Sequence, residues 1–247
     1  IVVFGADTDA SPYDSGSYAS STTYLTGKAT EKACMELREK MCAIAANILK
    51  CDTSELEFRG DGVYKLGSDE FVSRSDIATA SMVNNCIPAQ ATVSHSSPVS
   101  PPPFMVGMAE IELDKETGSV QVLNFSSVVD CGIPIAENLA RIQAEGGIVQ
   151  GIGMALSEDV TYTPDGQVIE NSFMQYKIPT RLDIGTLHVE FAHSHEPTGP
   201  YGAKSIGEVV INTSAPALAH AIFRATGVWH RCLPITPEKI LMEKNDD

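Results

Sequence analysis

Residues 105–130, MVGMAEIELDKETGSVQVLNFSSVVD, constrain the fold of this chain more than any other stretch. Apolar side chains alternate with polar ones on both sides of the polar segment 115–119. A period of two residues is typical of a strand with one buried face, and a short polar segment between two such runs is typical of a hairpin. The sequence therefore predicts a long β-hairpin at this place.

Helical periodicity is clearest in residues 28–49, where apolar side chains recur every three or four positions and charged ones lie mostly opposite. A shorter helix is expected at 73–82, with Ser73 or Ser75 as its cap. Two more helices are predicted, one after Pro134 through residue 159 and one from Glu208 to near Gly227.

Further β structure is expected outside the long hairpin. Turn residues between β-prone runs predict hairpins at 55–66 and 160–170, and single strands are expected at the start of the chain and at 186–193. Strands and helices follow one another without a regular βαβ rhythm, so the predicted fold class is α+β.

The one low-complexity stretch is residues 94–104, SHSSPVSPPPF. Consecutive prolines favour an extended backbone. The stretch is either a linker that subdivides the chain or a stiff loop packed over a core, and we favour the loop because strand signals resume at once. We therefore expect one domain over residues 1–247, with any subdivision near 94–104.

Composition excludes several classes of protein. The formal net charge of -15 offers no cationic surplus to displace counterions, so nucleic-acid binding is not expected. No apolar run approaches the ~20 residues that cross a bilayer, so no membrane segment is expected either. The six cysteines show neither CxxC nor zinc spacing and are interpreted as free thiols in a reducing cytoplasm: Cys34, Cys42, Cys51, Cys86, Cys131 and Cys232. An iron–sulfur cluster held by this chain is therefore not expected.

A single carboxylate, Glu208, ends the glycine-rich loop GPYGAKSIGE and precedes an apolar run. Lys204 and Ser205 match the last two positions of a nucleotide phosphate loop, but Ala203 replaces its second glycine and the first is also missing. Two interpretations stay open. Glu208 is either a charge that complements a helix dipole or a carboxylate shielded from water, whose raised pKa suits a general base.

Hydroxyl side chains crowd residues 15–27, SGSYASSTTYLTG, just before the predicted helix. A helix cap at Thr26 or Gly27 would explain one of these residues, because one cap needs only one hydroxyl. The surplus suits an oxyanion, particularly a phosphate, at a helix N-terminus. Capping and phosphate binding both remain open from the residues alone.

Two other features attract attention. The glycines of EGGIVQGIGMAL, residues 145–156, favour close packing against another backbone, and Gln150 is an amide inside that apolar run that needs a polar partner if buried. His193, His195 and Glu196 have a spacing that suggests a metal site, but solvated histidines beside an exposed loop are the favoured interpretation.

Five segments, in this order, carry a resemblance to a known family: SGSYASSTTYLTGKA (15–29), GMAEIELDKETGSVQVLNFSSVVDCG (107–132), QAEGGIVQGIGMALSED (143–159), YKIPT (176–180) and GAKSIGE (202–208). Together they resemble the C-terminal part of the molybdenum-binding subunit of the xanthine oxidase family of molybdenum hydroxylases. The resemblance covers residues 5–241 and implies a molybdopterin-binding domain with mixed sheets and packed helices.

The resemblance implies a site and a mechanism. The family's molybdenum is held by a pterin dithiolene rather than by protein side chains, and a glutamate is the base in the hydroxylation of an aldehyde or an N-heteroaromatic ring. That base matches Glu208, beside which Ser205, Ile206 and Gly207 would neighbour the cofactor, with Gly207 allowing close approach. The residues that match the segment lining the pterin and its phosphate tail are Tyr18, Ala19, Ser20, Ser21 and Thr22. Gln150 matches an amide near the cofactor.

The resemblance also implies partners, because the earlier half of the family's molybdenum subunit, with its G-Q-G cofactor loop, has no counterpart here. The chain is expected to need that half as a separate subunit, as in clostridial nicotinate dehydrogenase, or as the rest of a longer chain. It also implies [2Fe–2S] and FAD subunits and a cytosine dinucleotide form of the cofactor. Nicotinate and purines such as xanthine are the candidate substrates, and a selenido ligand would favour nicotinate.

Three hypotheses follow from the sequence. The first is a molybdenum hydroxylase subunit in the cytoplasm that oxidises an N-heteroaromatic compound or, alternatively, an aldehyde. The second is an assembly subunit that shares the fold without catalysis. The third, a nucleotide-hydrolysing enzyme using Lys204 and Ser205, is disfavoured by the missing glycines.

Overall fold

The computed structural model describes residues 1–83 and 88–242. The chain divides into two compact units: Ile1–Gly16 with Leu25–Pro98, and Ser17–Tyr24 with Val99–Asp247. Cys86, predicted to be a free thiol, lies outside the described residues. Within the described residues, no helix is both long and apolar enough to cross a membrane. The single domain expected from the sequence stays a prediction.

The first unit is built around most of helix α1, Thr22–Leu49. Met41, Ile44 and Ala45 of α1 form its core with residues of a three-stranded sheet, β1 (Leu56–Arg59), β2 (Gly62–Lys65) and β3 (Phe71–Ser73). The strands pair in the order β1-β2-β3, and β1 and β2 are antiparallel, so the hairpin predicted at 55–66 is confirmed. The third strand was not predicted because it is only three residues long.

Two sequence expectations for the beginning of the chain are wrong. Residues 1–21 form no strand, and Val2 and Val3 are 77% and 81% exposed. Helix α1 begins at Thr22 rather than at Lys28. Tyr24, only 4% exposed, lies in this added part of the helix, and its burial outweighs the weak helix propensity of the neighbouring threonines.

Helix α2, Arg74–Val83, follows β3 directly. The hydroxyl of Ser73 accepts a hydrogen bond from the backbone N–H of Asp76 at 3.1 Å and donates one to its carboxylate at 2.7 Å. Ser73 is therefore the cap of this helix, one of the two serines that the sequence proposed for that role.

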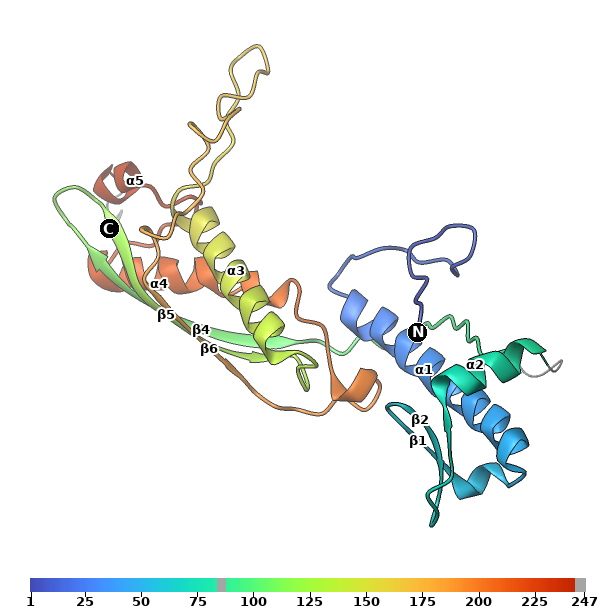
Figure 1. Ribbon diagram of the computed structural model, residues 1–247. Helices are drawn as coiled ribbons and strands as arrows, with labels where there is room; N and C mark the ends of the chain where they lie inside the picture. The colour runs from blue at the N-terminus through green and yellow to red at the C-terminus, as the bar shows by residue number, and fades with distance from the viewer. Residues whose placement is uncertain (84–87, 243–247) are drawn as a thin grey trace. The chain divides into compact units, whose positions relative to one another are not determined.

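The second unit is built on a mixed sheet whose order is β4-β5-β6 (Figure 1). Strands β4 (Phe104–Leu113) and β5 (Val120–Asp130) form the predicted long antiparallel hairpin. Strand β6 (Thr186–Phe191) lies parallel to β5, which is possible because helix α3 (Glu137–Leu156) provides the crossover between them. Helices and mixed pairing together confirm the predicted α+β class.

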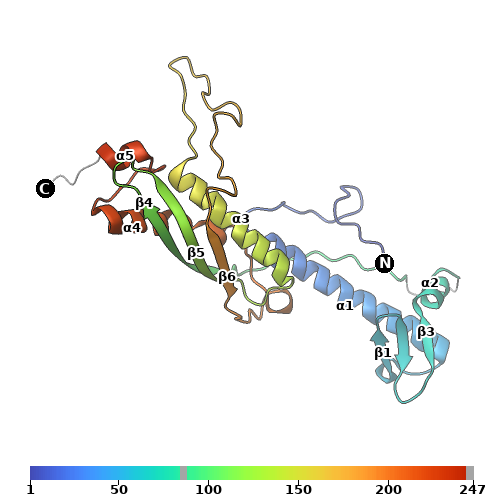
Figure 2. The ribbon, with the colours of Figure 1, turned by 60° about the vertical axis from the view of Figure 1, so that its left-hand side comes forward.

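Helices α3 and α4 (Ser214–Thr226) contact each other and cover the sheet (Figures 1 and 2). Phe125 and Val129 of β5 are completely buried with Ile148 of α3 and Leu218 of α4. On the alternate positions of β4, by contrast, Met108 is 71% exposed. One face of the sheet thus forms the core of this unit and the other faces outward.

Two predicted elements differ from the structure. Part of the segment between α3 and β6 projects beyond the end of α3 (Figure 2), and the hairpin expected at 160–170 is reduced to a single bridge between Tyr162 and Val168. Two short strands without a third have little stability of their own. The helix expected after Glu208 is interrupted: a short 3-10 helix, η3 (Val209–Ile211), precedes α4, and Gly227 caps α4 with φ +81°.

The glycines of α3 allow another backbone to approach, as the sequence favoured. A Cβ atom added to Gly151 would lie 2.6 Å from Cβ of Ser214 and 3.0 Å from the backbone oxygen of Ile211. A Cβ added to Gly146 would meet nothing within 4 Å. Of these two positions, only Gly151 therefore requires a glycine for packing.

This difference predicts opposite effects of the same substitution on the free energy of unfolding. Gly151→Ala should destabilise the protein by about 1–3 kcal/mol, because α3 and the start of α4 must separate. Gly146→Ala should stabilise it by about 0.5–1 kcal/mol, because alanine restricts the unfolded chain and favours helix. Urea denaturation of both variants measures the difference; equal effects would show that α3 does not pack as described.

Candidate functional site

The serine-rich segment adopts an unusual backbone at the start of α1. Ala19 and Ser20 both have positive φ, at 45° and 57°, a region that residues with a side chain rarely occupy. The hydroxyl of Tyr24 lies 2.7 Å from that of Thr198 and holds the segment to a second loop. Two consecutive left-handed residues are costly and indicate a conformation that the surroundings impose.

The second loop, residues 198–208, is fixed to the end of β5. Lys204 forms an ion pair with Asp130, with Nζ and Oδ2 2.8 Å apart, and its backbone N–H donates to the carbonyl of Cys131 at 2.7 Å. Gly132 and Ala203 form an isolated antiparallel bridge. The lysine that the phosphate-loop hypothesis needed therefore has a structural role within the chain.

Asp130 is the centre of this anchor. Its other oxygen accepts hydrogen bonds from the hydroxyl of Ser194 and, at 3.0 Å, from the backbone N–H of Gly132. Burial acts to raise the pKa of Asp130, but the hydrogen bonds from Lys204, Ser194 and Gly132, with the lysine's charge, outweigh it and hold the pKa below its ordinary value. The carboxylate is therefore charged at neutral pH and keeps the loop in place.

Glu208 and Ser20, which are 188 residues apart in sequence, meet where the two loops come together. The backbone N–H of Glu208 donates to Oγ of Ser20 at 2.7 Å, and the Ser20 hydroxyl donates to Oε2 of Glu208 at 3.2 Å. Among the described residues, Oε1 of Glu208 has no hydrogen-bond partner. The site thus presents one carboxylate oxygen that is held and one that is available.

Gln143, in the second turn of α3, contacts the loop that carries Glu208, and the sequence interpretation missed this contact. Its side-chain amide donates to the carbonyl oxygen of Gly207 at 3.2 Å. A Cβ atom added to Gly207 would lie 2.9 Å from Oγ of Ser20, so the close approach expected at this glycine is to a serine of the same chain. The sequence held one signal: Gln143 lies seven residues, or two helical turns, before Gln150 and so on the same face.

The environment of Glu208 differs from what the sequence suggested. Glu208 is exposed, because the next two residues, Val209 and Val210, occupy the inward positions and are only 8% and 0% exposed. The expectation of a carboxylate shielded by its apolar neighbours is therefore wrong for this chain. The helix-charge interpretation fails as well, since α4 begins only at Ser214 and Glu208 makes no side-chain cap of η3.

The other predicted site residues differ in accessibility. Ser205 is 9% exposed, and Ile206 packs against the core. Gln150 is exposed, since the inward face of α3 is taken by residues such as Ile148 and Gly151, so the condition under which it would need a polar partner is not met.

In the serine-rich segment, Tyr18 is 58% exposed and Ala19 is also exposed. The N–H of Ser21 donates to the carbonyl of Tyr18 at 3.0 Å, and the hydroxyls of Thr22 and Ser17 lie 2.7 Å apart. These contacts form a tight turn just before a 28-residue helix. The first N–H groups of a helix have no partner within it, so this turn offers donors that suit an anionic group such as a phosphate.

Metal ligation by side chains has no support in the described part of the chain. There, no three or more histidine, cysteine, aspartate and glutamate side chains are placed to hold a metal ion. His195 instead lies against Gly202, and Glu196 accepts a hydrogen bond from the hydroxyl of Thr198. The group at 193–196 is part of the loop structure.

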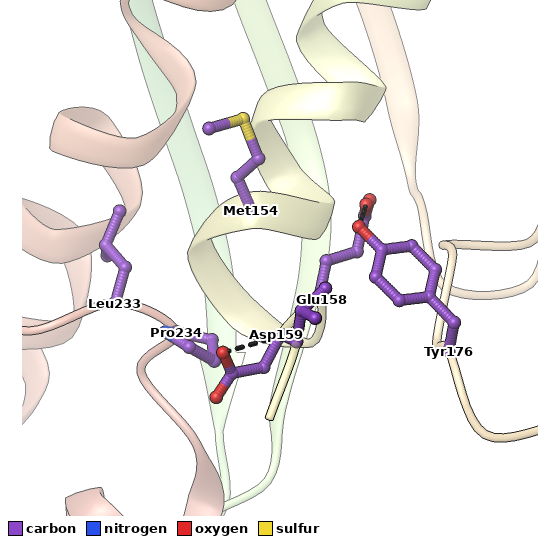
Figure 3. A pocket seen from close by; sticks show the side chains of 7 residues that line it. Met154, Glu158, Asp159, Tyr176, Leu233 and Pro234 are labelled. Atoms are coloured by element: carbon purple, nitrogen blue, oxygen red, sulfur yellow. Dashed lines mark hydrogen bonds between the residues drawn. The ribbon is translucent and has the colours of Figure 1, made fainter. Parts of the chain in front are cut away.

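A shallow pocket of about 320 Å³ lies at the far end of α3 (Figure 3). Its lining residues are Met154, Glu158, Asp159, Val160, Tyr176, Leu233 and Pro234. Tyr176 donates to Oε2 of Glu158 at 2.6 Å, and that hydrogen bond, with burial and the charge of Glu158, raises the pKa of Tyr176. None of the predicted site residues lines this pocket, and Met154 is about 16 Å along the helix from Gln143. It is therefore separate from the Glu208 site.

Known proteins are similar to this chain over most of its length. A family model described as a molybdopterin cofactor-binding domain matches residues 1–185. Two relatives are each 34% identical: the probable hypoxanthine oxidase XdhD of Escherichia coli (strain K12) over 241 residues, and the gamma subunit of the 6-hydroxypseudooxynicotine dehydrogenase complex of Paenarthrobacter nicotinovorans over 249 residues. Both alignments cover 97% of this chain, but 25% and 31% of the respective relative.

A solved structure agrees with this pattern. The crystal structure of quinoline 2-oxidoreductase from Pseudomonas putida 86 matches with a TM-score of 0.84 at 25% identity and covers 96% of this chain and 32% of that one. The chain therefore spans between a quarter and a third of the length of these three proteins.

The anchor at Asp130 generates a pH-dependent prediction. Asp130→Asn should lower the free energy of unfolding by about 1.5–3 kcal/mol at pH 7, because hydrogen bonds to a charged group are lost. The folded pKa is depressed, so the carboxylate's contribution is complete above its ordinary pKa of about 4 and disappears as pH falls through the lower folded value. Urea denaturation of the two proteins from pH 7 to pH 3 should show the difference shrinking only below about pH 4. A difference that is constant with pH would contradict the role of the charge.

Proposed function

Because this chain belongs to the molybdopterin cofactor-binding domain family, as the resemblance to molybdenum hydroxylases predicted, we propose that it supplies the base and part of the cofactor site of a molybdenum hydroxylase. The proposed enzyme hydroxylates an N-heteroaromatic substrate with oxygen from water. The observation that carries the proposal is the contact between Ser20 and Glu208. It joins the two segments that the resemblance assigns to the cofactor and to the base.

The residues present fit a phosphorylated organic cofactor better than a bare metal ion. The turn at Tyr18, Ala19, Ser21 and Thr22 leads into the N-terminus of α1, where backbone N–H groups can bind a phosphate. The described residues offer no group of side chains to ligate a metal, which agrees with a cofactor that brings its own sulfur ligands. When bound, the molybdenum–pterin group supplies the electron acceptor for the hydroxylation.

Within this proposal, Glu208 takes a proton at Oε1. The other oxygen, Oε2, accepts a hydrogen bond from the Ser20 hydroxyl, so the carboxylate is oriented before it takes the proton. Gly207, Ser205 and Ile206 form the loop that brings Glu208 to the cofactor, and the Lys204–Asp130 ion pair fixes that loop to the sheet. Gln150, exposed on α3, is available to donate to the cofactor from the same helix that holds Gly207.

The substrate class rests on the named relatives. One is called a probable hypoxanthine oxidase and the solved structure is of a quinoline oxidoreductase, both names of nitrogen heterocycles. We therefore propose a purine or another N-heteroaromatic ring, with hypoxanthine, xanthine, quinoline and nicotinate as the first compounds to test. We also propose a selenium ligand on the molybdenum and a cytosine dinucleotide tail on the pterin.

The proposal includes partner chains or domains. The name of one relative describes a subunit of a dehydrogenase complex, and this chain covers 31% of it. We propose that the rest of the molybdenum subunit and separate [2Fe–2S] and FAD subunits complete the enzyme. Cys34, Cys42, Cys51, Cys131 and Cys232 are free thiols, which supports a reducing compartment such as the cytoplasm.

The first experiment is elemental and flavin analysis of the complex purified from its native source through this chain. Stoichiometric molybdenum, with iron and flavin on accompanying chains, and oxidation of at least one of the four heterocycles are expected. Iron and flavin without molybdenum, and no turnover, would instead favour a non-catalytic assembly subunit.

The role of Glu208 predicts the effect of an isosteric substitution in that complex. Glu208→Gln should reduce kcat by about 10²–10⁴-fold, because the amide cannot accept the proton, while molybdenum content stays at the wild-type level. Glu112→Gln, the same change at an exposed position of β4, is the control and should leave kcat unchanged. Full turnover by Glu208→Gln would remove Glu208 from the role of base.

A further inference from the structure

We propose that Ser20 and Gln143 are positioning residues that hold the peptide between Gly207 and Glu208 and thereby aim the Glu208 carboxylate. The inference rests on the proposed function of Glu208 as the base. It assigns Gln143 a role that the sequence did not suggest, and it changes the role of Ser20 from a cofactor contact to a contact with the base.

The two side chains hold opposite ends of one peptide unit. The carbonyl oxygen of Gly207 accepts the Gln143 amide at 3.2 Å, and the N–H of Glu208 donates to the Ser20 hydroxyl at 2.7 Å. A peptide is planar, so holding both its oxygen and its N–H fixes the orientation of the plane. The Cα atom of Glu208 belongs to that plane, so the plane fixes the N–Cα bond from which the Glu208 side chain is directed.

Ser20 also holds the side chain itself. A serine hydroxyl has one proton to donate, and here it goes to Oε2 of Glu208 at 3.2 Å, while the same oxygen accepts from the Glu208 N–H. In this arrangement the hydroxyl has no proton left for a phosphate. Anion binding in the serine-rich segment therefore falls to backbone N–H groups and to neighbours such as Ser21 and Thr22.

The backbone conformation at Ser20 and at Gly207 also supports a positioning role for Ser20. Ser20 has a left-handed φ of 57° although it is not glycine, and in this strained conformation its hydroxyl meets both the N–H and the carboxylate of Glu208. Gly207 lacks the Cβ atom that would lie 2.9 Å from the serine oxygen. A strained serine and a glycine thus face each other where the carboxylate is held.

Glu208 is exposed in this chain, so packing does not restrict its side chain. The Ser20 and Gln143 contacts are the ones that restrict it among the described residues. Loss of either should leave the cofactor in place and let the base move. A displacement of about 1 Å at a catalytic group can cost on the order of 100-fold in rate.

The test uses the complete purified enzyme and the heterocycle, among the four named above, that the wild type oxidises fastest. Ser20→Ala should lower kcat by about 10- to 100-fold with little change in KM, and molybdenum and pterin contents should equal those of the wild type. Gln143→Glu, whose carboxylate cannot donate to the Gly207 carbonyl, should lower kcat in the same way. Metal content is the readout that separates positioning from cofactor binding.

Matched controls and a double mutant sharpen the test. Ser100→Ala and Gln121→Glu make the same changes at exposed positions outside the site and should leave kcat unchanged. Adding Ser20→Ala to Glu208→Gln should cause no further loss, because a residue that acts through Glu208 has no effect once the base is gone. If Ser20→Ala fails to fold, Ser20→Gly removes the same hydroxyl while relieving the backbone strain, and should show the same loss of kcat.

Three results would overturn the inference: wild-type kcat in Ser20→Ala and Gln143→Glu, a fall in molybdenum that parallels the fall in activity, or losses that multiply in the double mutant. The second result would make Ser20 a cofactor ligand instead. Failure of the proposed function has a different signature, since the wild-type complex would then lack molybdenum or Glu208→Gln would retain full activity.

Discussion

The ion pair between Asp130 and Lys204 is the interaction on which the site depends. Asp130 is the last residue of β5, the central strand of the mixed sheet, so its position is set by the most extensively paired part of the second unit. Lys204 belongs to the loop that ends at Glu208. Because three donors hold the Asp130 carboxylate in its charged form, the sheet fixes the loop at a point only four residues before Glu208.

From that anchor, the placement of Glu208 requires contacts from two other parts of the second unit. The serine-rich segment reaches it through Ser20, and helix α3 reaches the preceding peptide through Gln143. The packing of α3 on the sheet and the hydrogen bond of Tyr24 to Thr198 make both contacts possible. An exposed carboxylate is thus given a defined direction by hydrogen bonds rather than by burial, which leaves Oε1 accessible to a bound molecule.

Strong local patterns were predicted well from the sequence, and weak or non-local ones were not. The β4–β5 hairpin and α3 follow from long periodic runs, and five motifs in the same order along the chain were together sufficient to identify the family. Strand β3 was missed because three residues carry no periodic signal. Helix α1 was expected to start six residues late because the burial of Tyr24, a tertiary effect, extends it.

By itself, the sequence determined the α+β class, the family and the candidate base, because these depend on residue types and on their order along the chain. Only the tertiary structure decided how that base is held. Ser20 and Glu208 are 188 residues apart, and no local pattern pairs them. The helical spacing of Gln143 from Gln150 places both on one face of α3, but it does not indicate the contact of Gln143 with Gly207. Burial was also decided there: Gln150 and Glu208 adjoin apolar neighbours in sequence, yet the helix and loop geometry directs those neighbours inward and leaves both polar residues exposed.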